Sequence, residues 1–128
     1  MVISCGTVLA QYSKEFDSCI DKAQTQLAMH MCASDEAKRA DTELNDVYRK
    51  LQSAASKQPN AVAKITAAER AWIAYRDAYI ETMWPADDKQ REYGSSFTTE
   101  ANLLRAKLTR RQIEALKELL RQYSGSQR

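Results

Sequence analysis

Glycine, proline and histidine are scarce in this chain of 128 residues, which holds three glycines, two prolines and one histidine. Strands and tight turns consume glycine and proline, while long helices exclude them, so this scarcity favours helices. The length fits one domain, and 44% hydrophobic residues are enough for a core. We therefore expect an all-α fold, a small bundle of about four helices with two long antiparallel helices.

Long apolar runs are also missing, and no stretch approaches the ~20 residues that a helix needs to cross a membrane. We therefore expect no transmembrane helix. The three cysteines, Cys5, Cys19 and Cys32, form no Cys-x-x-Cys motif, and His30 is the single histidine. A structural zinc site needs about four such ligands, so the composition argues against a metal site.

Motifs for catalysis and cofactor binding are absent as well. The sequence has no phosphate loop and no dinucleotide fingerprint, so we expect no cofactor. His30 could act as a catalytic base only beside a nucleophile, and the sequence lacks the glycine-rich turn that would present one. Asp41 and Asp77 lie on different predicted helices and could meet as a glycosidase-like carboxylate pair. We favour a salt bridge to Arg76 instead, and the chain is not expected to be an enzyme.

Charge is nearly balanced, and the formal net charge of +2 is too small to indicate nucleic-acid binding by itself. Basic residues gather near the C-terminus, where residues 100–128 hold seven Lys or Arg against three Asp or Glu. No aromatic platform for base stacking alternates with them. A solvated helix surface explains this pattern, and we expect no binding of nucleic acid.

The first 18 residues are interpreted as the remnant of a targeting segment, with a disordered N-terminus as the alternative. Residues 8–10 read V-L-A before Gln11, which is typical of a signal-peptidase site. Residues 2–5 read V-I-S-C, which is typical of a bacterial lipobox with Cys5 as the lipidated residue. These short patterns point to export, with a lipid anchor at Cys5 as one form of it.

Apolar residues recur at helical spacing over two long segments. The first covers about residues 25–51, with Thr25 as its candidate N-cap. The second covers about residues 60–83 and is bounded by Pro59 and Pro85, because proline disfavours helix at the residue before it. These segments are the two long helices of the expected bundle.

A polar segment and two further helices are predicted to follow. Residues 84–97 are rich in loop-forming residues and form the best loop candidate. A third helix is expected from residue 98 or 99 to 107. Thr109 and Gln112 then form a capping box that starts a fourth helix, and residues 124–128 make a disordered tail.

Two stretches of the sequence resemble a known family. Residues 32–33 and 40–48 read C-A and A-D-T-E-L-N-D-V-Y, and residues 69–78 read E-R-A-W-I-A-Y-R-D-A. Their order and spacing are similar to the C-A…A-D-x-x-L-N-x-x-Y and Q-R-A-W-I-x-Y-R-D-A patterns of LprI-like lysozyme-inhibitor domains. The resemblance covers about residues 19–116, and the predicted domain covers residues 19–123.

The chain departs from the family pattern at a few positions. Two cysteines that the family commonly carries are replaced by Ile80 and Leu104, which suggests an apolar contact in place of one disulfide. The family glutamine at the start of the second pattern is Glu69 here. These changes affect the expected number of disulfides and leave the expected fold unchanged.

The resemblance implies an exported bacterial binding protein, periplasmic or secreted, whose partner is lysozyme or a related cell-wall hydrolase. The alternatives are an immunity protein against a secreted toxin and an envelope protein with a structural role. Most motif residues are predicted to be structural. The expected core residues are Leu44, Tyr48, Trp72 and Tyr75. The expected inter-helix polar network consists of Asp41, Asn45, Arg76 and Asp77.

Asp87 and Asp88 are the predicted contact with the hydrolase, because a mobile acidic loop could enter the cationic cleft of a basic lysozyme. Oxidation during export predicts a disulfide between Cys19 and Cys32, the two cysteines that remain once Cys5 is assigned to targeting. In one straight helix these two residues would stand about 20 Å apart. The chain must therefore bend before Thr25, with residues 19–24 running non-helically along the next helix; two free thiols in one helix are the alternative.

Overall fold

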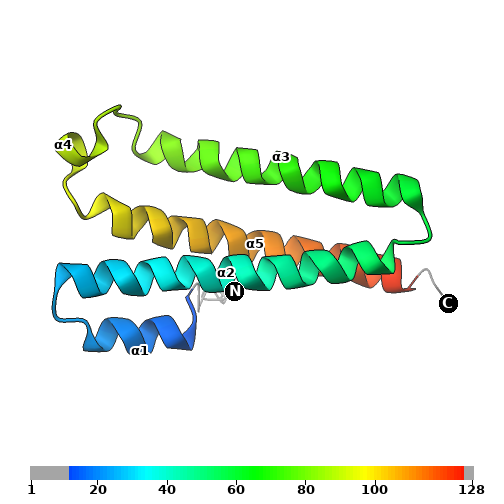
Figure 1. The fold of residues 1–128 in the computed structure, drawn as a ribbon, viewed down its shortest axis with the longest axis horizontal. Helices are drawn as coiled ribbons and strands as arrows, with labels where there is room; N and C mark the ends of the chain where they lie inside the picture. The colour runs from blue at the N-terminus through cyan, green and yellow to red at the C-terminus, as the bar shows by residue number, and fades with distance from the viewer. Residues whose placement is uncertain (1–11, 126–128) are drawn as a thin grey trace, which may run out of the picture.

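The computed structural model describes residues 12–125, and these residues form helices without any strand. The helices are α1 (Lys14–Lys22), α2 (Gln26–Ala54), α3 (Pro59–Met83), α4 (Lys89–Tyr93) and α5 (Phe97–Gly125). The expected all-α bundle is confirmed. Figure 1 shows α2 and α3 running in opposite directions, while α2 and α5 start at the same end of the molecule.

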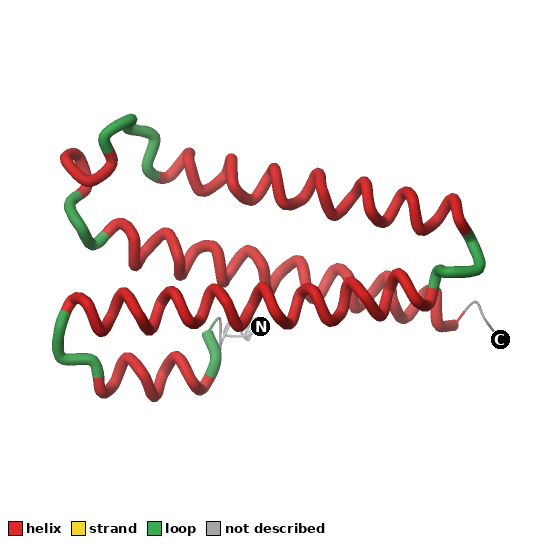
Figure 2. Tube along the Cα trace, viewed as in Figure 1, coloured by secondary structure: helices red, strands yellow, loops and turns green. Residues whose placement is uncertain are grey.

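Helices α2 and α5 pack closely along their lengths, and α1 folds back beside the first half of α2 (Figure 2). The main apolar cluster lies between α2, the first half of α3 and the second half of α5. It consists of Leu44, Val47, Leu51, Ala55, Ile65, Ile113 and Leu116, with Tyr48 and Trp72 packed against it. This cluster therefore holds the end of the bundle where α2 turns into α3.

Local sequence signals set several helix ends. The Thr25 hydroxyl accepts a hydrogen bond from the Ala28 amide at 3.0 Å, as expected of an N-cap. Pro59 is the first residue of α3, where its missing amide proton costs no helical hydrogen bond. Gly94 ends α4 with φ of 75°, a left-handed conformation that suits glycine.

The predicted break at Thr109 is wrong, because α5 is one continuous helix of 29 residues from Phe97 to Gly125. Thr109 is fully buried, and its hydroxyl accepts a hydrogen bond from Arg76 instead of capping a new helix. Gln112 donates to Glu69 of α3 instead of reaching back to Thr109. Tertiary partners thus use both side chains of the apparent capping box.

The predicted loop at residues 84–97 contains the short helix α4. Tyr75, which was expected in the core, is 64% exposed and contacts only the ring of Tyr79 among the described aromatic side chains. Tyr75 directly precedes the buried Arg76, and the turn of about 100° between neighbouring helical residues places the two side chains on different faces of α3. The apolar stripe is therefore wider than the buried face.

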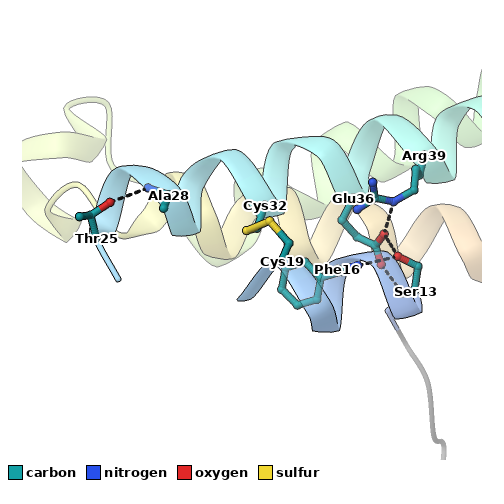
Figure 3. Close-up of a disulfide and its surroundings, with 8 residues drawn as sticks. All are labelled: Ser13, Phe16, Cys19, Thr25, Ala28, Cys32, Glu36 and Arg39. Carbon is teal, nitrogen blue, oxygen red and sulfur yellow. Dashed lines mark hydrogen bonds and ion pairs between the residues drawn. A yellow bond between two sulfur atoms is a disulfide. The ribbon is translucent and has the colours of Figure 1, made fainter. Parts of the chain in front are cut away.

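Cys19 and Cys32 form the predicted disulfide, with their Cα atoms 5.8 Å apart (Figure 3). The expected bend is also present, although its form differs from the prediction. Residues 19–22 belong to α1, and the chain reverses over residues 23–25. Helix α1 begins at Lys14, and Phe16 is buried where α1 packs against α2.

Replacing both bridge cysteines by serine should lower the free energy of unfolding by about 3 kcal/mol, because the bridge closes a short loop in the unfolded chain. Urea titration of the wild type and the Cys19→Ser/Cys32→Ser variant measures this difference. Mass spectrometry after alkylation gives the control, since these two thiols should react only after reduction. Alkylation of both without reductant would contradict the disulfide.

Candidate functional site

A buried guanidinium joins the three long helices. Arg76 of α3 is 5% exposed, and its Nη1 donates to Asp41 of α2 and to Thr109 of α5, at 3.4 Å in each case. Its Nε donates to Asp77 at 3.1 Å, and Asp41 also accepts from Arg105 of α5 at 3.1 Å. We call these five residues the Arg76 cluster.

Trp72 lies one helical turn before Arg76. The Arg76 guanidinium lies over the Trp72 ring, 5.1 Å from the ring centroid. This is a cation–π contact, which adds to the stability of a charge removed from water. Asp41 bridges Arg76 and Arg105 with its two oxygens. The cluster therefore contains the inter-helix salt bridge that the sequence analysis favoured over a catalytic carboxylate pair.

Asn45 does not belong to this cluster, although it was expected to. It lies one turn after Asp41 and is exposed, and its side chain forms no hydrogen bond with the described residues. It lines a hollow of about 200 Å³ beside Arg76 instead. Asp41 is itself only half-buried, and the step of four residues to Asn45 turns the side chain about 40° further round α2, toward the exposed face.

A second buried charge, Glu36 of α2, was missed by the sequence analysis. It is 0% exposed and accepts hydrogen bonds from the Ser13 amide at 2.5 Å and the Ser13 hydroxyl at 2.7 Å (Figure 3). Arg39 and Arg110 donate to it at 3.2 and 3.3 Å. The signal was present, because Glu36 falls on the apolar stripe between Ala33 and Ala40.

Glu36 is held in its charged form by these donors. Burial raises the pKa of a carboxyl group, but the hydrogen bonds from Ser13 and the charge of Arg110 outweigh burial and lower the pKa of Glu36. Glu36 thus ties the N-terminus of α1 to α2 and α5. At Glu69 of α3 the balance is reversed, since burial raises its pKa more than Gln112 and Arg76 lower it.

The segment between α3 and α5 presents the two predicted contact residues. Asp87 and Asp88 are exposed, and the Asp88 carboxylate caps α4 by accepting from the Arg91 amide at 3.1 Å. Lys89 donates to the carbonyls of Trp84 at 2.8 Å and Ala86 at 3.0 Å. These bonds fold residues 84–91 into a defined shape.

Two hollows lie along the half of α3 that leads to this segment. The hollow beside Arg76 is also lined by Ile73 and Arg105. The next has a volume of about 270 Å³ and is lined by Asp77, Ile80 and Glu81 of α3 and by Ala101, Asn102 and Arg105 of α5. Because both hollows are lined by Arg105, we treat them together and call them the α3–α5 groove.

Within residues 12–125, no group of three His, Cys, Asp or Glu side chains is placed to hold a metal ion. His30 contacts the Thr99 hydroxyl, which joins the start of α2 to the start of α5. None of the described helices is both long and apolar enough to cross a membrane. Cys5, the predicted lipidation site, lies outside the described residues.

These features define a small helical domain in which one disulfide links α1 to α2 and buried ion pairs link the long helices. Residues 19–116 match the family described as "Lysozyme inhibitor LprI". The chain therefore belongs to the LprI lysozyme-inhibitor family. It is also 29% identical over 130 residues to an uncharacterised protein of Rhizobium meliloti (strain 1021), covering 93% of this chain and 90% of that protein. No solved structure matches the chain.

Arg76→Ala should lower the free energy of unfolding by about 2–4 kcal/mol, because Asp41 loses one of its two cationic partners and the buried Thr109 hydroxyl loses its donor. Thermal and urea denaturation measure the loss. Arg49→Ala is the matched control, since Arg49 pairs with Asp46 on the exposed face of α2 and should contribute less than about 1 kcal/mol. Equal, small effects of the two substitutions would show that Arg76 does not hold the helices together.

Proposed function

We propose that this protein is exported and inhibits a lysozyme or a related cell-wall hydrolase by binding to it. The match of residues 19–116 to the lysozyme-inhibitor family carries this proposal. On this view the protein acts by occupying the enzyme and catalyses no reaction itself. Its place of action is the periplasm or the medium, with a lipid anchor at Cys5 as one means of retention.

The disulfide supports export. Bridges such as Cys19–Cys32 persist in oxidising compartments and are rare in the bacterial cytosol. The bridge also fastens α1, whose first residues overlap the proposed targeting segment, to α2. An anchored N-terminus would therefore be connected to a rigid part of the domain.

The binding surface is proposed to include Asp87 and Asp88, which lie in the segment between α3 and α5. Residues 77–92 carry five Asp or Glu against two Lys or Arg, whereas the whole chain has a net charge of +2. Lysozymes are usually basic, so this local charge suits them better than the overall charge does. The family motif is a poor candidate for the contact, because Arg76 is buried and bonded to residues of its own chain.

Asp87→Asn with Asp88→Asn tests this surface. Asparagine keeps an acceptor that can cap α4, so the variant should retain its melting temperature within about 2 °C. Inhibition of cell-wall lysis by a basic animal lysozyme should weaken about tenfold, since two charges facing a cationic cleft are lost.

The control is Glu114→Gln with Glu118→Gln, which removes two exposed carboxylates from α5. This variant should inhibit as well as the wild type. If the loop variant inhibited fully, the contact would lie elsewhere on the protein. If the wild type failed to bind or inhibit any lysozyme in a panel of the known types, the proposed function would be wrong.

A further inference from the structure

The outer side of α3 has few of the charges that cover the exposed sides of α2 and α5. Between Lys64 and Glu81, only Arg70 and Asp77 are both charged and exposed. Four of the eight large apolar side chains that are exposed in residues 12–125 lie on this helix, and Tyr75 is 64% exposed. A helix with one side on a core and the other in water normally carries polar residues on the second side. Helix α3 therefore presents an apolar face that no described residue covers.

A line of residues along this face has the spacing of a coiled coil. Its members follow one another at alternating steps of three and four residues, and all of them are exposed: Lys64, Ala67, Ala71, Ala74, Ala78 and Glu81. We call them the outer line of α3. Such heptad spacing gives a continuous contact when two helices pack side by side. The outer line lies opposite the buried Ile65, Glu69 and Arg76, so a second helix can pack on it without disturbing the bundle.

The order of residues in the outer line suits a second copy of the same helix. Its spacing reads the same in both directions, with four alanines in the middle and a charge of opposite sign at each end. If two copies pack antiparallel, Ala71 faces Ala74 of the second copy and Lys64 faces Glu81, and a two-fold axis repeats each contact. Alanine lets the two backbones approach closely. A partner of another sequence places no such demand on the order of residues in α3.

Charges at the edge of the face select the same arrangement. Lys64 and Arg70 lie in the first half of α3, are exposed, and have no ion-pair partner among residues 12–125. Asp77 and Glu81 lie in the second half. Each pairs with one cation of its own chain and remains 58% or 63% exposed, so each can accept from a second cation. Antiparallel packing brings the cations of one copy beside the carboxylates of the other, whereas parallel packing would set Lys64 beside Lys64.

We propose that the outer line of α3 is a self-association surface, on which a second copy of this protein packs its own α3 in the antiparallel direction. The inference goes beyond the proposed function and is independent of it, because no hydrolase takes part in the contact. A single pair of helices makes a small interface, so we expect a Kd of about 10 µM and monomers in dilute solution.

Sedimentation velocity of the full chain, over concentrations that span this Kd, tests the surface. The wild type should change from monomer to dimer. Ala74→Glu should weaken association at least about tenfold, because a carboxylate beside the two-fold axis loses water and gains no partner. Ala115→Glu, the same change at an exposed alanine of α5, should associate as the wild type does. A monomeric wild type, or equal effects of the two substitutions, would overturn the proposal.

A charge exchange tests the antiparallel direction. Lys64→Glu should weaken association about tenfold, because the new carboxylate faces Glu81 of the second copy. Adding Glu81→Lys should restore most of the loss, since opposite charges then face each other again. The two positions stand about 25 Å apart along one helix, so a rescue cannot arise within a monomer. Failure of the double variant to associate better than Lys64→Glu would contradict the antiparallel pairing.

Discussion

The buried guanidinium of Arg76 is the interaction on which the arrangement of the three long helices depends. A charge removed from water is stable only when partners in fixed positions compensate for its lost hydration. Those partners are Asp41 on α2 and Thr109 on α5, so α3 cannot slide or rotate without breaking them. Trp72 links the same residue to the apolar cluster. Polar and apolar contacts thus specify one register.

The predictions that came true rest on local rules or on covalent chemistry. Thr25 caps α2 because its hydroxyl needs only an amide three residues ahead. The Cys19–Cys32 pairing followed from counting cysteines in an oxidising compartment. Thr109 shows where such rules end. Its sequence context is that of a capping box, but a residue on another helix uses its hydroxyl, and sequence spacing carries no information about that partner.

Burial was predicted less well than helicity. The apolar stripe of α3 continues to Tyr75 and Met83, yet both side chains are more than half exposed, and after Arg76 residues 77–83 are all exposed or half-buried. Glu36 shows the opposite case, a charged side chain buried under α1 by donors from three segments. A stripe predicts which face of a helix can be buried, whereas the neighbouring helices decide how much of it is. Residues 77–83, the more exposed end of α3, lead into the candidate binding surface at Asp87 and Asp88.

Hydrogen exchange of the wild-type protein, resolved by residue, tests the central claim that Arg76 marks the limit of the packed part of α3. Amides of residues 65–76 should exchange nearly as slowly as those in the centres of α2 and α5, because opening them breaks the buried cluster. Amides of residues 77–83 should exchange distinctly faster. Uniform protection along the whole of α3, or fast exchange throughout it, would contradict the account.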